Sequence, residues 1–367
     1  MKLPLLLALL LAVPPARGAA PHLSPVRLAI VGLVHDHARI MLDALRHEPD
    51  VQLVGIVEAD PALAATYREA FHLDPALFYP TFAALVAKNQ VQAVAAFTST
   101  LGHRQVVEEC APLGIDVMME KPMAVSLAEA RAIAAAAERG KIQLVINYET
   151  TWFRSVHEAY ARTHDLPGLG ELRKIVAHDG HRGPRDIGCS PAFLAWLTDP
   201  EQDGGGAAMD FGCYGADLIT YLMDGLRPDA VTAVFGHSQP DKYPRVEDEA
   251  TIVLSYPKTQ GIIEASWNWP YGRKDLEVYG QTGALLAPDG NSLSVVSPDG
   301  RAEAVAVPAL VPAESGFLPY LVGVVRGTFK PYGPSAVSTN LVVCEILDAA
   351  RESARTGRRV ELGSADQ

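Results

Sequence analysis

The sequence predicts an α/β protein with a Rossmann-type, doubly wound parallel sheet followed by an α+β domain with a large, mainly antiparallel open sheet. From Val26 onwards, short apolar runs alternate with helical stretches of about ten residues, which is the rhythm of βαβ units. After Asn147, strand-like runs follow one another across short turns, which indicates antiparallel pairing. The 367 residues exceed what one typical core organises, so we expect two domains, 26–146 and 147–362.

The first domain is expected to bind a dinucleotide, and ligands of such sheets bind at the carboxyl ends of the strands. Asp60 before Pro61 is a helix start, and Ser126 with Glu129 forms a capping box. The predicted strands are 27–31, 52–57, 91–97, 116–119 and 143–146, and the predicted helices are 37–47, 60–70, 103–113 and 126–139.

The second domain is expected to bind substrate and to mediate oligomerisation. An open apolar sheet face often becomes an interface between subunits, so we expect a homodimer or homotetramer. The predicted strands are 171–178, 231–235, 250–256, 261–267, 274–279, 284–287 and 293–296, and the predicted helices are 155–162, 210–223 and 340–356.

Charge and cysteine usage limit the classes of partner. The formal net charge is −12 with acidic and basic residues mixed, which argues against a nucleic-acid partner and favours a small, neutral or weakly charged ligand. The four cysteines form no CxxC pair, which argues against a structural zinc site. We expect them to be buried apolar residues and not a disulfide framework.

The first twenty residues are typical of a secretory signal peptide. Lys2 precedes an apolar run from Leu3 to Val13, and small residues suited to cleavage follow two prolines. The run is too short for a permanent transmembrane helix. We therefore expect a periplasmic or secreted protein without membrane association after residues 1–20 are removed; an uncleaved N-terminal anchor is the alternative.

The first strand leads into the turn Gly32-Leu33-Val34-His35-Asp36-His37. A dinucleotide fingerprint reads G-x-G-x-x-G; here Val34 stands at the second glycine position and His37 at the third. The histidines could donate hydrogen bonds to a phosphate or a substrate. Adjacent ligands on one tight turn seldom converge on one ion, so we predict no metal site.

Two further strand ends carry candidate residues. Glu58 is placed to accept hydrogen bonds from the adenosine ribose hydroxyls and to repel the extra phosphate of NADP, which favours NAD; an ordinary exposed acid is the alternative. Lys121, in Glu120-Lys121-Pro122, is expected to point into the ligand crevice, where partial burial would suit it to proton transfer.

Asp210 and Tyr214 stand four residues apart at the start of a predicted helix, and therefore on one helix face. The preceding glycines, Gly204 to Gly206, allow this helix start to lie close to another backbone. A carboxylate and a phenol beside a lysine suit a substrate with several hydroxyl groups. The alternative makes Asp210 an N-cap and Tyr214 a half-buried aromatic.

These pieces occur together and in order, and the chain resembles the glucose–fructose oxidoreductase / inositol dehydrogenase / MocA family from Val26 to Leu362. The further motifs that carry the resemblance are Val57-Glu58-Ala59-Asp60-Pro61, Thr98…His103, Asn147, Gly168-Leu169-Gly170-Glu171, Glu247-Asp248-Glu249-Ala250, Glu277-Val278-Tyr279-Gly280-Gln281-Thr282-Gly283 and Ser353-Ala354-Arg355-Thr356-Gly357-Arg358.

The resemblance implies reversible hydride transfer between NAD or NADP and a sugar or cyclitol hydroxyl. It implies that Lys121 is the catalytic lysine, that Asp210 binds substrate and that Tyr214 donates or accepts the proton. The implied cofactor-binding residues are Gly32, Val34, His35, Glu58, Thr98, His103 and Glu120.

The leading hypothesis is an exported carbohydrate oxidoreductase that retains a tightly bound NAD(P). Export of an unfolded chain to a place with little free NAD motivates the retention. The rival hypothesis is a sugar-binding or non-redox protein of the same fold that has lost the dinucleotide, and the missing glycines motivate it.

Overall fold

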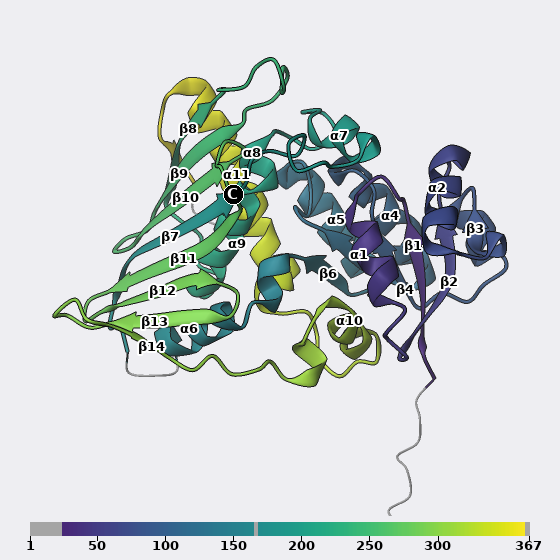
Figure 1. The fold of residues 1–367 in the computed structure, drawn as a ribbon, viewed down its shortest axis with the longest axis horizontal. Helices are drawn as coiled ribbons and strands as arrows, with labels where there is room; N and C mark the ends of the chain where they lie inside the picture. Colours follow the sequence, from purple (N-terminus) through teal and green to yellow (C-terminus); the bar gives the residue numbers. More distant parts are fainter. Residues whose placement is uncertain (1–23, 165–167, 364–367) are drawn as a thin grey trace, which may run out of the picture.

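The computed structural model describes residues 24–164 and 168–363, and Figure 1 shows two sheets side by side with helices packed around them. The predicted signal peptide, residues 1–20, lies outside the described residues. Within the described residues, no helix combines the length and apolar character needed to cross a membrane.

The first sheet has six strands in the order β3-β2-β1-β4-β5-β6, and its neighbouring strands pair in parallel. This is the order of a dinucleotide-binding sheet. It confirms the predicted doubly wound class. The strands are β1 (Val26–Val31), β2 (Val51–Val57), β3 (Phe78–Tyr79), β4 (Ala93–Ala96), β5 (Asp116–Glu120) and β6 (Leu144–Asn147).

The helices of the first domain begin where the sequence places their caps. The Asp60 side chain accepts a hydrogen bond from the Ala62 amide at 2.8 Å, and Ser126 accepts one from the Glu129 amide at 3.3 Å. Phe78–Tyr79 and Phe82–Val86 form elements too short to give a periodic signal. The helices are α1 (His37–Ala44), α2 (Pro61–Phe71), α3 (Phe82–Val86), α4 (His103–Cys110) and α5 (Leu127–Gly140).

The second sheet has nine strands in the order β14-β13-β12-β11-β7-β10-β9-β8-β15. Among the described pairs, β7 with β10 is parallel and the others are antiparallel, which confirms the mainly antiparallel prediction. The strands are β7 (Leu172–Gly180), β8 (Ala230–Gly236), β9 (Glu249–Ser255), β10 (Gln260–Ser266), β11 (Arg273–Gly280), β12 (Ala284–Asp289), β13 (Ser292–Val296), β14 (Ala302–Ala304) and β15 (Val360–Glu361).

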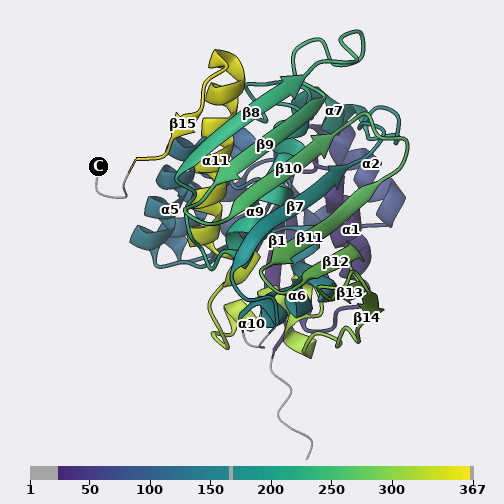
Figure 2. The same cartoon turned by 90° about the vertical axis from the view of Figure 1, so that its left-hand side faces the viewer.

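Helices cover one face of this sheet and leave the other open, as Figure 2 shows. Residues that alternate along the strands follow this division: Ile175 and Ala177 of β7 are buried under the helices, whereas Val176 is half-buried on the open face. The covering helices are α6 (Arg154–His164), α9 (Gly212–Leu222) and α11 (Val337–Thr356).

The predicted helix 210–223 is in fact two helices, α8 (Ala207–Asp210) and α9, with a break at Phe211. Asp210 is the last residue of α8, so it is not an N-cap. The helix begins at Ala207, three residues before the predicted start. Gly206 lies against the backbone of Glu247, the close approach that the glycines were expected to allow. The Ala207 amide donates to the Glu247 carbonyl at 3.0 Å, and a Cβ on Gly206 would lie 2.0 Å from that oxygen.

Two helices of the second domain have no counterpart in the sequence prediction, α7 (Pro191–Leu197) and α10 (Phe317–Val325). Leu318 and Leu321 of α10 join the same buried cluster as Leu28 and Ile30 of β1. The C-terminal half therefore completes the core of the first domain, and the two domains share apolar packing.

All four cysteines are free, and three of them are buried. The expectation that they are apolar core residues is confirmed for Cys110, Cys213 and Cys344, while Cys189 is half-buried.

Candidate active site

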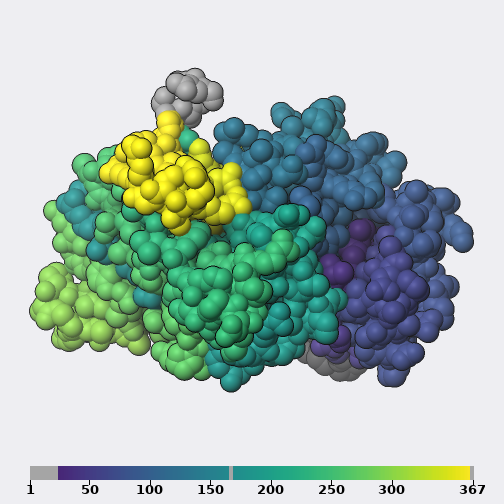
Figure 3. All heavy atoms as spheres, turned by 90° about the horizontal axis from the view of Figure 1, so that it is seen from above, coloured from purple at the N-terminus to yellow at the C-terminus, as the bar shows by residue number. Residues whose placement is uncertain are grey.

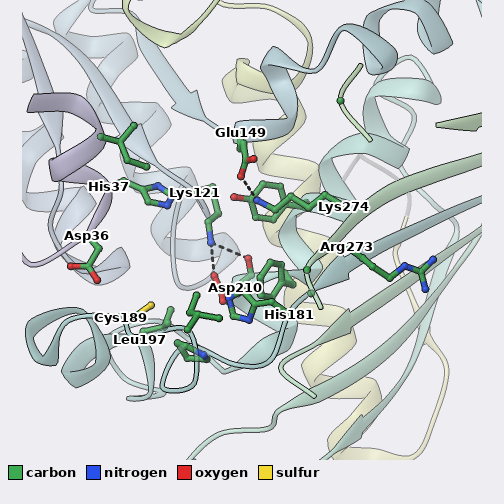
Figure 4. A pocket seen from close by; sticks show the side chains of 18 of the residues that line it. Asp36, His37, Lys121, Glu149, His181, Cys189, Leu197, Asp210, Arg273 and Lys274 are labelled. Atoms are coloured by element: carbon green, nitrogen blue, oxygen red, sulfur yellow. Dashed lines mark hydrogen bonds and ion pairs between the residues drawn. The ribbon is translucent and has the colours of Figure 1, made fainter. Parts of the chain in front are cut away.

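A cavity of about 950 Å³ lies between the two domains at the carboxyl edge of the parallel sheet. Lys121, Asp210 and Tyr214 all line it, together with His35 and His37 from the first turn. The structure therefore brings these five residues to one cavity, and their roles stay predictions. Figure 4 shows Lys121 and Asp210 facing one another across the cavity floor.

A buried ion pair joins Lys121, which follows β5, to Asp210 at the end of α8. The Lys121 Nζ lies 2.6 Å from Asp210 Oδ1 and also donates to the Asp210 carbonyl at 3.0 Å. The other carboxylate oxygen accepts from the Trp267 indole at 2.9 Å. The peptide bond between Lys121 and Pro122 is cis.

The pair keeps both groups charged in spite of their burial. Burial opposes ionisation of Asp210, but Lys121 outweighs it and lowers the pKa of Asp210 to about 2. Burial also opposes the Lys121 charge, yet Asp210 holds the lysine pKa above its ordinary value. Lys121 is therefore an ammonium ion at neutral pH, able to donate a hydrogen bond to a substrate hydroxyl.

Tyr214 of α9 lies beside two lysines. The Lys121 Nζ is 5.1 Å from the centre of its ring, and the Lys274 Nζ of β11 is 4.4 Å from it. Burial raises the pKa of Tyr214 to about 12, and the two lysines act against that rise. Two ammonium groups therefore lie beside the phenol and offset part of the effect of burial.

The structure adds functional side chains that the sequence analysis missed. Lys274 forms an ion pair with Glu149, and both line the cavity. His181 also lines it, and its Nδ1 accepts a hydrogen bond from the Gly183 amide at 2.9 Å. Each belongs to a strand end or loop without a motif around it. Tertiary packing brings them to the site: the Lys274 Nζ lies over the Tyr214 ring, and the His181 ring packs against Phe211 at 4.7 Å.

The turn after β1 retains the conformation that its one glycine allows. Gly32 has a φ of +81°, and a Cβ there would lie 2.9 Å from the Phe97 carbonyl oxygen. The Val34 side chain does not line the cavity; its carbonyl accepts from the Trp196 indole at 3.2 Å. His35 is buried between Phe193 and Trp196, and burial first, then His37, lowers its pKa well below the usual value.

Helix α7 of the second domain thus lies directly over this turn. The Ser190 amide, just before α7, donates to the Asp36 carboxylate at 2.7 Å. Seen from above in Figure 3, the teal part of the chain rests against the purple and blue first domain.

Glu120 is buried at the centre of a hydrogen-bonded group. One of its oxygens lies 3.1 Å from His37 Nδ1, and the other accepts from the Asn147 side chain at 2.9 Å. His35, His37 and Glu120 bring potential ligand atoms within 4.8 Å of one another, an arrangement that could hold a metal ion. The predicted absence of a metal stays a prediction.

Glu58 lies at the end of β2, as predicted, and lines a second cavity of about 300 Å³. Its carboxylate accepts the Leu33 amide at 2.9 Å and the Asp60 amide at 2.9 Å. Small and aromatic side chains form the walls, with Arg68 at the side; among them are Ala64, Ala65, Phe78 and Tyr79. The size and lining fit an adenosine.

Thr98 and His103 stand apart from both cavities. The Thr98 methyl group would contact a Cβ on Gly32 at 2.9 Å, so Thr98 shapes the turn. His103 is buried with Nδ1 3.2 Å from the Met123 carbonyl, behind the Lys121-Pro122 turn, and burial lowers its pKa to about 4. Their direct contact with a cofactor stays a prediction.

Two family models match the chain. Residues 26–148 match an oxidoreductase family with an NAD-binding Rossmann fold, and residues 166–286 match the GFO/IDH/MocA C-terminal domain. The fold and the site define an oxidoreductase class with a dinucleotide-binding domain. The chain belongs to the Gfo/Idh/MocA family, which confirms the resemblance seen in the sequence.

Several relatives are similar over different lengths. D-apiose dehydrogenase of Paraburkholderia graminis is 24% identical over 90% of this chain and 88% of its own. The putative UDP-kanosamine synthase oxidoreductase subunit of Amycolatopsis mediterranei is 32% identical over 59% of this chain and 56% of its own. The match thus spans less than two thirds of the latter protein.

Solved structures share the fold over nearly the whole chain. Aldose-aldose oxidoreductase from Caulobacter crescentus, complexed with glycerol, has a TM-score of 0.79 at 25% identity and covers 92% of this chain and 100% of its own. An inositol dehydrogenase homolog complexed with NAD+ from Azotobacter vinelandii has a TM-score of 0.79 at 18% identity, covering 95% and 100%.

Replacing Asp210 tests the buried ion pair. Asp210→Asn leaves the Lys121 charge buried without its partner, so we expect the free energy of unfolding at pH 7 to fall by about 3 kcal/mol. Because the pKa of Asp210 is depressed to about 2, its stabilisation is present above about pH 4 and is lost as pH falls through 2. The difference between wild type and variant should therefore narrow in acid.

Chemical denaturation at several pH values measures this difference. Asp186→Asn is the control, because Asp186 pairs with Lys242 on the surface and should change stability by less than about 1 kcal/mol. An Asp210→Asn variant as stable as wild type at pH 7 would contradict the expectation.

Proposed function

We propose that this protein is an exported NAD(P)-dependent oxidoreductase that transfers a hydride to or from a hydroxyl-bearing carbon of a sugar, cyclitol or glycoside. The observation that carries the proposal is the grouping of Lys121, Asp210 and Tyr214 in one cavity at the carboxyl edge of a dinucleotide-binding sheet. Ligands of such sheets bind at this edge.

The described residues fit a dinucleotide on its adenosine side. Gly32 lets the turn lie against the Phe97 carbonyl, and the cavity beside Glu58 would receive the adenosine. Glu120 and Asn147 line a small cavity that shares His37 and Glu149 with the main one, and they would hold the nicotinamide ribose. When bound, the nicotinamide supplies the acceptor or donor of the hydride.

The residues of the chain handle the proton and the substrate. Lys121 donates a hydrogen bond to the reacting hydroxyl, and Tyr214 takes the hydroxyl proton in oxidation or returns it in reduction. Asp210 uses its carboxylate to fix Lys121, since both of its oxygens are already bonded. This sharpens the expected role of Asp210 from orienting the sugar to orienting the lysine.

The cavity suits a substrate with hydroxyl groups at one end and apolar surface at the other. Polar side chains line its floor, while Tyr271, 62% exposed, and Ile187, 46% exposed, line it as well. A protruding aromatic ring stacks well against a sugar ring or an aglycone. At about 950 Å³ the cavity has room for a glycoside beside the nicotinamide.

Two substitutions test the chemistry. Tyr214→Phe removes the proton-transferring hydroxyl and Lys121→Met removes the ammonium, so each should lower kcat about 10²–10⁴-fold with less effect on KM. The rate is measured as the increase in absorbance when NAD or NADP is reduced, with aldoses and glycosides as substrates. Tyr279→Phe, which changes a tyrosine on β11 outside the cavity, is the control.

Calorimetric titration with NAD and NADP tests the cofactor. We expect tighter binding of NAD, because the Glu58 carboxylate repels a ribose phosphate. Glu58→Gln should weaken NAD binding about tenfold and reduce the discrimination against NADP, whereas Glu69→Gln on exposed α2 surface should change neither.

The same titration separates the rival function. The Asp36 carboxylate at the start of α1 stands where a pyrophosphate would lie, which favours a protein of this fold that binds a sugar without a dinucleotide. Absence of binding by both dinucleotides, with no nucleotide released on denaturing native protein, would support that rival.

Retention of the cofactor is part of the proposal. Helix α7 and the Ser190 amide cover the turn after Gly32, so a dinucleotide seated there would be slow to exchange. Denaturing native protein and identifying the released nucleotide tests this.

Location and assembly are proposed on separate grounds. The signal-like residues 1–20 support a periplasmic or secreted protein. N-terminal sequencing of the native protein tests whether these residues are removed. The open face of the second sheet, where Val234 is 71% exposed, supports a homodimer or homotetramer, which light scattering measures.

A further inference from the structure

We propose that Lys274, and not Lys121, is the residue that sets the acidity of Tyr214. Glu149 forms an ion pair with Lys274 and thereby reduces the effect of Lys274 on Tyr214. The inference rests on the proposed role of Tyr214 as the proton-transferring residue. It assigns a positioning function to two residues, from β11 and from the short helix at Glu149–Trp152, that carry no motif.

The geometry distinguishes the two lysines. Lys121 directs two of its three donors to Asp210, at 2.6 Å and 3.0 Å, and lies 5.1 Å from the centre of the Tyr214 ring. Lys274 lies closer, at 4.4 Å, and its side chain is 21% exposed. A lysine neutralised by a buried carboxylate exerts less net field on its neighbours than one paired with a half-exposed acid.

Glu149 is that half-exposed acid. Its side chain is 56% exposed, so water screens its charge, while the Lys274 side chain is mostly buried. Figure 4 shows the Glu149 side chain reaching Lys274, whereas Arg273, the preceding residue of β11, points away. The net local field at Tyr214 is therefore positive.

The other groups around Lys274 add little opposing charge. Asp179 of β7 is its cross-strand neighbour, but burial raises the pKa of this carboxyl well above its usual range, which disfavours its charged form. His181 follows β7, and burial lowers its pKa, which keeps the imidazole neutral. Glu149 is thus the anion that opposes Lys274, and Lys121 and Asp210 offset one another.

The two residues are predicted to shift the acidity of Tyr214 in opposite directions. In hydroxyl oxidation the substrate O–H proton would pass to the Tyr214 phenolate, and the C–H hydride to the oxidised nicotinamide of the proposed function. The rate therefore rises with pH as Tyr214 ionises. Loss of the Lys274 charge raises the pKa of Tyr214 and moves this rise to higher pH. Loss of the Glu149 charge lowers that pKa and moves the rise to lower pH.

The experiment compares Lys274→Met, Lys274→Arg and Glu149→Gln with wild type. On the rising limb of the pH profile of kcat, Lys274→Met should be about tenfold slower or more at a given pH, since one pKa unit is a tenfold change. Lys274→Arg should show the same kcat as wild type at each pH on this limb. Glu149→Gln should be faster than wild type, by less than the factor for Lys274→Met. Lys174→Met, which removes a lysine from β7 outside the cavity, is the matched control.

A second measurement does not require turnover. A fluorinated tyrosine at position 214, whose phenol is more acidic, allows its ionisation to be followed by ¹⁹F NMR in the full chain. Its titration midpoint should rise in Lys274→Met and fall in Glu149→Gln. Equal midpoints in all variants, or shifts of the same sign, would overturn the inference; shifts as expected in a protein without oxidoreductase activity would overturn only the proposed function.

Discussion

The ion pair between Lys121 and Asp210 is the contact on which the site depends. The lysine comes from the end of a strand in the first domain and the carboxylate from a short helix of the second, so the charged floor of the cavity exists only when the domains are packed together. Trp267 fixes the second carboxylate oxygen. Because both ions are buried, each is stable only with its partner, and this requirement fixes where a substrate hydroxyl can be held.

Near this pair, two lysines have different functions in the proposed mechanism: one donates a hydrogen bond to substrate, and the other sets the acidity of Tyr214. Lys121 is bound tightly by Asp210 and serves as an oriented donor. Lys274, paired with the half-exposed Glu149, retains a larger influence on Tyr214. Proton transfer to or from a substrate hydroxyl is faster when the pKa of the general acid–base lies near the working pH. Two lysines with different partners supply these properties without one compromising the other.

The turn after β1 shows how a second domain can change a cofactor site. Where glycines would leave the backbone bare, this chain has Val34 and His37. Between them, α7 packs on His35, and the amide that precedes α7 donates to Asp36. The bulk of these side chains is accommodated by the neighbouring domain. A dinucleotide in this site would be held between the turn and α7, so binding and release would depend on movement of both.

By itself, the sequence determined the alternation of strands and helices, the caps at Asp60 and Ser126, and the residues at strand ends, because these follow from local periodicity and capping chemistry. It also grouped Lys121, Asp210 and Tyr214. Only the tertiary structure decided the split between α8 and α9, the packing of α10 into the first core, and the meeting of Lys274 and Glu149 at Tyr214. Those features depend on contacts between residues far apart in the chain, which leave no periodic or motif signal along it.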